Sequence, residues 1–510
     1  MGWDPSSHPS GLGTATSFGW LAFGLALIHI VLGIILYEPT LFPGGDNAGY
    51  LILGEALRNG DGYRDLYIPG TPFHAKYPPL LPSLLAILGG VQVSKFAMLA
   101  CTSLAVWVTA QLGRRIVGDG LALLTAMFIA VNPTLLEYGH YVLSEAPFIL
   151  LVLLALWASQ YDNRRGSVLA LVAAIGAFAT RTAGLTILIA LPVSWLFRKD
   201  FRRAAVGGIT AVVTLVGWGL YQARVAPMQP SYLKEIILLD PYSPDAGSVD
   251  LGQLVVRTAS NLWEYVSRVI PQTVAGLEGS STGLTIAFGL GLGGLAITGW
   301  AIRARRSPGS LEIFVLLYGG LIAIWPEVWT DRRFFLPLLP MMLLMSVWCL
   351  GQINRGFRRW VFASLVLFVS FPSIVWIIER APSRIECAAA YRAADPCDAP
   401  AYASLYKAAL WARDNTPPEA VFANRKPRLF FWYSRRQGNL YPYSTEPDFV
   451  LAELDRMGAD YVVVDQVSGT TARYLVPAIQ ANRSRFEPVY QGGSPPTLIF
   501  RLLPIPAMAQ

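Results

Sequence analysis

Residues 41–82 read LFPGGDNAGYLILGEALRNGDGYRDLYIPGTPFHAKYPPLLP. This segment is rich in Asp, Tyr, Gly and Pro, and it directly follows the first long apolar segment of the chain, residues 17–37. Its pattern predicts a helix that begins near Asp46, while the apolar stretch 78–90 is broken by prolines and too short to cross a bilayer. We therefore expect residues 38–90 to form a long loop with interfacial helices at one membrane face.

The composition is that of a polytopic membrane protein. Of the 510 residues, 54% are hydrophobic and only 14% are charged, whereas soluble domains carry roughly 25% charged residues. The net charge of +7 does not indicate nucleic-acid binding, because Lys and Arg fall mainly in short clusters between apolar segments, where they set membrane orientation. We read residues 17–37 as a retained first span and not as a signal peptide.

The basic clusters define a topology. Between neighbouring clusters the sequence holds enough apolar residues for two spans, so all of them can lie on the cytoplasmic side. This predicts about eleven spans in the inner (plasma) membrane, a cytoplasmic N-terminus and an outer location for everything after residue 380. The clusters are Arg114 with Arg115, Arg164 with Arg165, and the segments 198–203, 303–306 and 355–359.

The last part of the chain has the composition of a soluble domain. Helical periodicity in LYKAALWARDNTPP and FVLAELDRMGA alternates with the short strands AVFA and DYVVVD, and PVYQGG with TLIFRLL predicts a closing hairpin. We expect a transmembrane domain over 1–380 and a small α/β domain with a partly parallel sheet over 381–510. An oxidising compartment would permit a disulfide between Cys387 and Cys397, although the sequence does not fix the pairing.

Two carboxylates are expected in the outer loops. Asp46, in PGGDNAGY, either caps the following helix or acts as a general base that accepts a proton from an attacking hydroxyl. Glu145, in YVLSEAPF, begins a span, where a carboxylate either stabilises the helix N-terminus or faces a cavity or partner.

Basic and aromatic side chains are expected in the same outer loops as these two carboxylates. Arg181, in FATRTAGLTIL, should pair with an anion, because an unpaired guanidinium in apolar surroundings is costly. Arg332 and Arg333 either pair with Asp331 and snorkel, or bind a phosphate, which arginine contacts in a bidentate manner. Lys76 is a further candidate for a phosphate. The expected substrate-binding residues are Tyr50, His74, Tyr77, His140 and Tyr141.

These segments carry a resemblance to a known family. Asp46 after the first span is followed in order by YLILGEALRNGDGYRDLY, YPPLLPSLLAIL, RRIVG, YVLSEAPF, TRTAG and RRFFLPLLP. The pattern resembles the bacterial family 39 glycosyltransferases, relatives of the dolichyl-phosphate-mannose protein mannosyltransferases and of the aminoarabinose transferase that modifies lipid A. The resemblance implies a GT-C fold and an enzyme that moves a sugar from a polyprenyl-phosphate donor to a lipid, glycan or protein acceptor.

The resemblance also implies roles for particular residues. Asp46 matches the aspartate regarded as catalytic, Glu145 matches an acidic position of the next outer loop, and Arg332 or Arg333 matches a basic position near the donor phosphate. Asn47 follows Asp46 where many relatives have Glu, so a paired-carboxylate metal site in this loop is not implied. A divalent metal ion is compatible with the pattern, no other cofactor is expected, and the expected mechanism is a single inverting displacement.

Three other functions are compatible with parts of the sequence. A flippase or transporter of lipid-linked sugars would carry its charges through the bundle, whereas the ionisable residues here gather at one face. A different GT-C activity would differ only in its acceptor. A membrane-anchored binding module would need one or two spans and not eleven.

Overall fold

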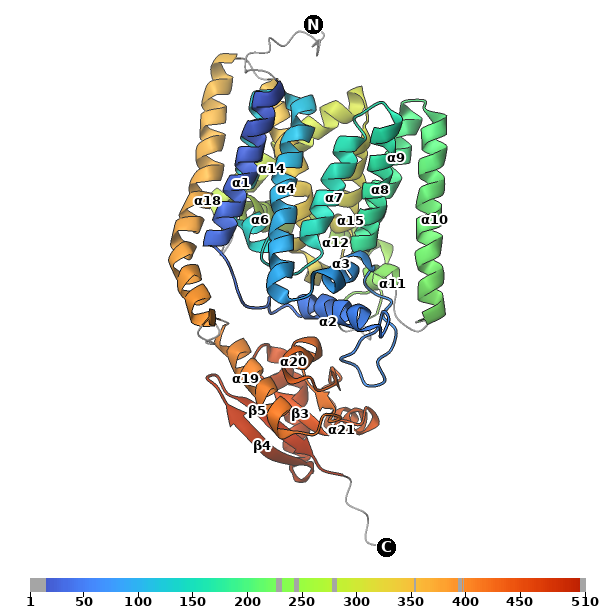
Figure 1. Cartoon of the computed structure of the whole chain (residues 1–510), viewed down its shortest axis with the longest axis vertical. Helices are drawn as coiled ribbons and strands as arrows, with labels where there is room; N and C mark the ends of the chain where they lie inside the picture. The colour runs from blue at the N-terminus through green and yellow to red at the C-terminus, as the bar shows by residue number, and fades with distance from the viewer. Residues whose placement is uncertain are drawn as a thin grey trace.

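The computed structural model describes residues 15–225, 232–242, 247–277, 282–352, 355–392, 397 and 399–504. It consists of a bundle of long helices and a small C-terminal α/β domain at one end of the bundle, shown in orange and red in Figure 1. We call this end of the bundle the domain end and the opposite one the far end. The predicted fold class is confirmed, because the chain is a polytopic helical membrane protein with a small C-terminal sheet domain.

The bundle contains helices long and apolar enough to cross a membrane. Five have this length, and four shorter apolar helices accompany them. Together with α8 and α18 they correspond to the eleven predicted spans. The five are α1 (Ala15–Ile35), α4 (Val91–Val117), α10 (Phe201–Val225), α14 (Gly283–Arg306) and α16 (Arg332–Phe335) continued by α17 (Leu339–Gly351); the others are α5 (Asp119–Ala130), α7 (Glu145–Ala158), α8 (Arg164–Thr180), α9 (Leu185–Phe197), α15 (Ser310–Ala323) and α18 (Arg355–Arg392).

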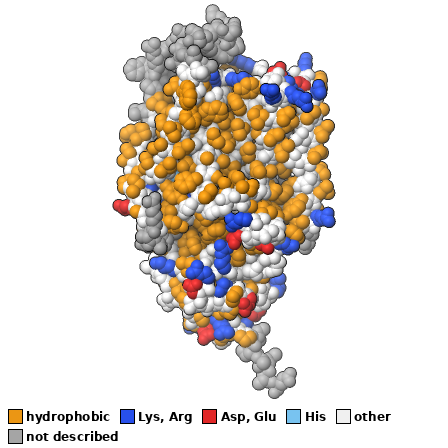
Figure 2. All heavy atoms as spheres, viewed as in Figure 1, with side chains coloured by type: hydrophobic (Ala, Val, Ile, Leu, Met, Phe, Trp, Pro, Cys, Tyr) orange, Lys and Arg blue, Asp and Glu red, His pale blue; other side chains and the backbone are white. Residues whose placement is uncertain are grey.

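The surface of the bundle matches a bilayer. Hydrophobic side chains cover most of the bundle face seen in Figure 2, and Lys and Arg side chains lie at the far end and again around the domain end. At that end Arg115 donates to the carbonyl of Gln160, and Arg203 ion-pairs with Asp162, so the clusters that follow α4, α7 and α9 lie side by side. An even number of crossings therefore separates these three clusters from one another, as the sequence predicts.

The loop after α1 lies across the ends of the long helices at the domain end of the bundle. It contains α2 (Asp46–Asn59) and α3 (Leu80–Leu88), which pack against each other and lie beside the ends of the long helices in Figure 1. The close approach needs Gly54, because a Cβ there would lie 2.9 Å from the Cβ of Leu85 and 3.1 Å from the carbonyl oxygen of Pro82. With nine residues, α3 is too short to span, as predicted.

Shorter helices complete the bundle. They are α6 (Pro133–Tyr138), α11 (Tyr232–Ile237), α12 (Leu251–Glu264) and α13 (Ile270–Ala275). The glycine-rich sequence 287–300 lies inside α14, where Gly289 and Gly299 leave no room for a Cβ against the carbonyl groups of Val266 and Met345. These glycines serve close helix packing, as expected for a membrane span.

The C-terminal domain is built on a five-stranded sheet of order β2-β1-β3-β5-β4. The pairs β1–β2 and β1–β3 are parallel, and β3–β5 and β4–β5 are antiparallel, so the sheet is partly parallel as predicted. α18 continues through residue 381 to Arg392, and α19 opens the domain. The elements are α19 (Pro400–Asn415), β1 (Phe422–Ala423), α20 (Pro427–Ser434), β2 (Gly438–Asn439), α21 (Pro447–Arg456), β3 (Tyr461–Val464), α22 (Val476–Ala481), β4 (Phe486–Gly492) and β5 (Thr497–Leu502).

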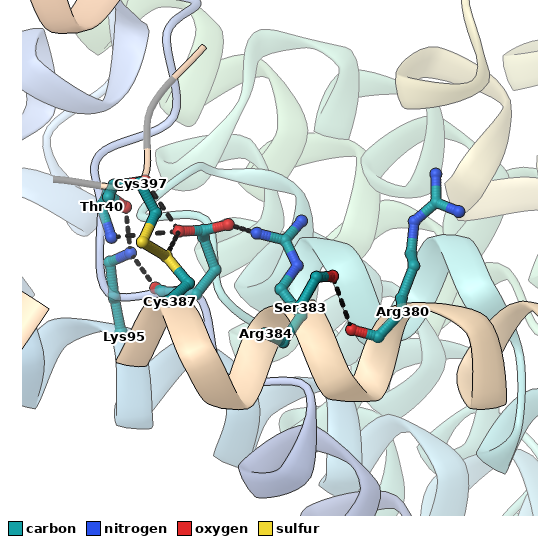
Figure 3. The surroundings of a disulfide bond; sticks show 8 residues. Thr40, Lys95, Arg380, Ser383, Arg384, Cys387 and Cys397 are labelled. Carbon is teal, nitrogen blue, oxygen red and sulfur yellow. Dashed lines mark hydrogen bonds and ion pairs between the residues drawn. A yellow bond between two sulfur atoms is a disulfide. The ribbon is translucent and has the colours of Figure 1, made fainter. Parts of the chain in front are cut away.

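A disulfide between Cys387 and Cys397 lies where the bundle meets the domain (Figure 3). Beside it Glu38 ion-pairs with Arg384 of α18, and Lys95 of α4 donates to the backbone carbonyls of Glu38 and Thr40. Lys95 is only 1% exposed, so its ammonium group depends on these acceptors. This contact fixes the beginning of the loop 38–90 between α4 and α18.

The disulfide gives a labelling prediction. The chain has four cysteines, and Cys101 and Cys349 are free. Denatured protein prepared without reductant should add two maleimide groups by intact mass, and four after reduction. A Cys387→Ser variant should add three without reductant. Four labels on unreduced wild type would contradict the pairing.

Candidate active site

A cavity of about 360 Å³ opens at the domain end of the bundle. Its walls come from α2, from the loop before α3, from the α7 and α8 ends and from the connection between α15 and α16. Most of its lining side chains are polar or aromatic. The residues that the site uses are Asp46, Tyr50, Lys76, Tyr77, Ser144, Arg181, Tyr242, Trp329, Asp331 and Arg333.

Asp46 is placed by a glycine turn. Gly45 is the N-cap of α2 with φ +91°, a left-handed conformation that favours glycine, and it leaves Asp46 as the first helical residue. The Asp46 carboxylate accepts hydrogen bonds from Arg333 Nη1 (2.8 Å, to Oδ2) and Tyr77 Oη (2.9 Å, to Oδ1). The interpretation of Asp46 as a helix cap is therefore wrong, since its side chain points to groups on other elements.

Glu145 is the buried partner of two arginines. It is 0% exposed, begins α7, and ion-pairs with both Arg181 and Arg333. Arg181, at the C-cap of α8, also donates to Ser144 Oγ at 3.2 Å. Arg333 thereby bridges the carboxylates of Glu145 and Asp46, and the expected anionic partner of Arg181 is Glu145. Four residues from four elements form one ionic cluster.

A fifth member, Arg428, comes from the C-terminal domain. Its Nη1 lies 3.5 Å from Asp46 Oδ1 and donates to Tyr77 Oη at 2.6 Å, while its Nε donates to Tyr67 Oη at 3.3 Å. It reaches α2 over Gly49, where a Cβ would lie 3.0 Å from Arg428 Cδ. No sequence pattern predicts this residue, because it lies 382 positions from Asp46 in a short helix without a motif.

The arginines set the ionisation of Asp46. Burial would raise the pKa of the Asp46 carboxyl, but Arg333 and Arg428 outweigh it, and together with the Tyr77 hydroxyl they hold this pKa well below its usual range. Burial raises the pKa of Tyr50 to about 12. Asp46 is therefore ionised and Tyr50 is protonated at neutral pH, and 30% of the Asp46 side chain is accessible from the cavity.

Solved structures of two transferases share this architecture. The archaeal oligosaccharyltransferase AglB from Archaeoglobus fulgidus, in complex with an inhibitory peptide and a dolichol-phosphate, is similar with a TM-score of 0.59 and 14% identity, over 94% of this chain and 74% of AglB. ArnT from Cupriavidus metallidurans bound to undecaprenyl phosphate is similar with a TM-score of 0.57 and 14% identity, over 96% of this chain and 98% of ArnT.

The chain has the GT-C fold. ArnT in the apo state is similar at a TM-score of 0.59 over 95% of this chain. Comparison with protein-family models and with curated protein sequences finds no match. At this level of identity the likeness establishes the architecture, and the chemistry has to be argued from the residues of the cavity.

Some of the predicted residues lie on the cavity of this GT-C bundle. Asp46, Arg181, Arg333 and the predicted substrate-binding residues Tyr50 and Tyr77 line it. Lys76 also lines it, with its ammonium group 2.8 Å from Glu235 Oε1. Glu145 lies directly behind the arginines.

Other predicted residues lie away from the cavity. Arg332 ion-pairs with Glu137 at 3.0 Å, and Tyr141 Oη donates to the same carboxylate at 2.7 Å. His140 is 2% exposed, and burial lowers its pKa to about 3, so it is neutral at physiological pH. None of these three is among the described lining residues of the cavity. His140 and Tyr141, in the turn before α7, lie beside Trp376 and Arg384 of α18, and Arg332 of α16 is held at Glu137.

His74 has a supporting position. It is 2% exposed, its Nδ1 donates to Asp65 at 2.9 Å, and its Nε2 accepts from the backbone N–H of Tyr77 at 2.8 Å. These two bonds orient the loop 74–77, which carries Lys76 and Tyr77 into the cavity. His74 acts on the site through Tyr77 and is not itself among its described lining residues.

The site does not fit a divalent metal ion. Within the described ranges, no three His, Cys, Asp or Glu side chains are grouped in a way that could hold one. The carboxylates of Asp46 and Glu145 are both engaged by guanidinium groups, so a cation between them would face arginine charge.

Replacing Glu145 by Gln should destabilise the fold strongly. The substitution leaves Arg181 and Arg333 without their buried counter-charge, and breaking such a pair costs about 3–5 kcal/mol. We expect a clear loss of thermal stability in detergent, measured by the melting temperature.

Glu137→Gln is the matched control, since Glu137 also pairs with an arginine but its side chain is 14% exposed and the partner Arg332 is 25% exposed. We expect the control to melt within a few degrees of wild type. Equal melting temperatures for the two variants would show that Glu145 does not neutralise the cluster.

Proposed function

We propose that the protein is an integral-membrane glycosyltransferase that moves a sugar from a polyprenyl-phosphate donor to an acceptor at the outer membrane face. The observation that carries the proposal is the ionised, accessible Asp46 in a polar cavity lined by cations at the membrane boundary. The bound dolichol-phosphate of AglB and undecaprenyl phosphate of ArnT, in proteins of the same architecture, support this class of donor.

An apolar groove next to the cavity suits the lipid chain of the donor. It has a volume of about 400 Å³, lies between η4 (Tyr265–Val269), α14, α15 and α17, and is lined almost wholly by hydrophobic side chains. Its rim residues Leu262, Ile297 and Leu316 are more than half exposed on the bundle surface, where lipid would surround them. Phe335, two residues after Arg333, belongs to its lining, so the groove leads towards the ionic cluster.

The leaving phosphate would bind between Lys76 and the arginines. Lys76 is 37% exposed and lines the same cavity as Arg181 and Arg333. A phosphate oxygen that gains charge in the transition state is stabilised by such cations without a metal ion. Trp329, whose Nε1 donates to Tyr242 Oη at 3.3 Å, offers an apolar face on which a sugar ring could stack.

The reaction would be a single displacement with inversion. The acceptor oxygen forms a bond to the anomeric carbon while the bond from that carbon to the phosphate oxygen breaks, and the electron pair of this bond stays on the phosphate. Asp46 takes the hydroxyl proton of the acceptor. The products are the glycosylated acceptor and the polyprenyl phosphate.

Arg428 restrains Asp46 before the acceptor arrives. A carboxylate that accepts three hydrogen bonds is a weak base, so proton transfer requires that at least one donor is released. The guanidinium group of Arg333 also ion-pairs with the buried Glu145. Arg428, in contrast, belongs to α20 of the C-terminal domain. We infer that the acceptor hydroxyl replaces Arg428 at Oδ1, which raises the pKa of Asp46 when it is needed as a base.

The proposed orientation follows from the basic clusters. They lie at the far end, so the positive-inside rule places that end in the cytoplasm and the catalytic cavity and the C-terminal domain outside the inner (plasma) membrane. The disulfide Cys387–Cys397 at the domain end suits an oxidising compartment.

Asp46→Asn should abolish transfer, and a thermal melt in detergent checks that the variant stays folded without this counter-charge of Arg333 and Arg428. The substitution keeps the size of the side chain and removes the proton acceptor, which typically contributes about 10²- to 10⁴-fold to the rate. We would measure transfer of radiolabelled sugar from synthetic polyprenyl-phosphate donors in membranes at matched expression. The control is Asp61→Asn in the same loop, an exposed residue that should retain wild-type activity. Full activity of Asp46→Asn would remove Asp46 from the chemistry.

Arg428→Gln should shift the pH profile. Loss of this charge raises the pKa of Asp46, and a neighbouring cation typically lowers an aspartate pKa by about 1–3 units. A carboxylate base works above its pKa, so the acid limb of kcat/KM should move to higher pH.

The matched control for this profile is Arg435→Gln, which removes the ion pair between the C-cap residue of α20 and Glu55 and leaves Asp46 untouched. Its acid limb should coincide with that of wild type. If the acid limbs of kcat/KM coincide for Arg428→Gln and Arg435→Gln, Arg428 does not set the pKa of Asp46.

A further inference from the structure

A second large cavity lies at the far end of the bundle, away from Asp46. Its volume is about 780 Å³, against about 360 Å³ for the candidate active site. Helix ends form it: the C-terminus of α9 with Arg198, the C-terminus of α14 with Arg303 and Arg306, and the N-terminus of α15. Trp348 of α17 forms one wall.

Two of the three arginines that line this cavity are not paired with an acidic side chain of the described residues. Glu312, the one acid among its described lining residues, is 2% exposed; it accepts from Arg303 Nε at 2.7 Å and from the backbone N–H of Gly309 at 3.0 Å. Arg303 thus neutralises Glu312. Arg198 and Arg306 have no carboxylate within ion-pair distance among the described residues, so the cavity carries a net positive charge.

The backbone adds to the positive electrostatic potential of this cavity. α15 is a helix of 14 residues whose first residues Ser310 and Leu311 line the cavity, and the N-terminus of a helix presents unpaired N–H groups and a partial positive charge. Together with arginine side chains, such an end favours an oxyanion such as a phosphate.

Aromatic side chains accompany the arginines of this cavity. Phe197 and Phe201, which flank Arg198 in the chain, are 61% and 68% exposed, and the guanidinium groups of Arg303 and Arg306 lie 5.7 and 5.9 Å from the Trp348 ring. Exposed aromatic rings beside arginines at a membrane boundary match the interface between acyl chains and headgroups.

We propose that this cavity binds the phosphodiester headgroup of an anionic phospholipid from the leaflet opposite the candidate active site. Arg198 and Arg306 contact the phosphate, the α15 N-terminus faces it, and the acyl chains run along the exposed rings of α9 and α10. Gln160, whose side-chain oxygen has no hydrogen-bond partner among the described residues, lines the same cavity and can accept from a glycerol hydroxyl. The site is independent of sugar transfer.

The test is native mass spectrometry of the full chain in detergent, titrated with phosphatidylglycerol or phosphatidylcholine. Wild type should retain one phosphatidylglycerol with clear preference over phosphatidylcholine. The double variant Arg198→Gln, Arg306→Gln should bind it roughly tenfold or more weakly, since each basic side chain at an anionic lipid contributes a severalfold factor. A thermal melt of the variant verifies that it is folded.

The matched control is Arg164→Gln, Arg165→Gln, which removes the same charge from the exposed start of α8 outside the cavity. It should bind like wild type. Equal weakening in both double variants would mean that surface charge alone attracts the lipid, and displacement of the lipid by millimolar inorganic phosphate would mean that the cavity takes a free anion. Either result would overturn the proposal.

Discussion

The bridging of Asp46 and Glu145 by Arg333 is the interaction on which the rest of this structure depends. It joins the loop helix α2 to the starts of α7 and α16, and Arg181 and Arg428 extend it to α8 and to the C-terminal domain. Charges at the edge of a hydrocarbon layer are costly unless paired. Each group therefore fixes the position of the others, and the helices that carry them are held in one arrangement.

The same cluster explains why the C-terminal domain sits where it does. Arg428 can approach Asp46 only over Gly49, and the apolar side chains beside it, Leu429 and Phe431, pack on Ala48 and Ile52 of α2. The backbone N–H of Gly438 donates to the carbonyl of Tyr67 at 2.8 Å, which ties the sheet edge to the long loop. A domain docked in this way places the charge of Arg428 beside Asp46.

Much of the fold is readable from the sequence, because bilayer thickness and the cost of buried charge constrain it tightly. Apolar length separates α3 from the spans, and the spacing of the basic clusters predicts that those after α4, α7 and α9 share one end of the bundle. The same cost of charge singles out Asp46, Glu145, Arg181 and Arg333. The sequence does not show which charged residues pair with each other. Arg332 and Arg333 are adjacent, and only their positions around the helix direct one to Glu137 and the other to Asp46. Arg428 lies in a domain with many arginines, so no local signal distinguishes it.

The most direct measurement is mass spectrometry of the donor lipid in liposomes that contain the purified chain, a panel of synthetic polyprenyl-phosphate sugars and a cell-envelope extract as acceptor. We predict that free polyprenyl phosphate accumulates from at least one donor, and only when acceptor is present. Donor that stays intact while it moves from one leaflet to the other would contradict the transferase and identify a transporter of lipid-linked sugars.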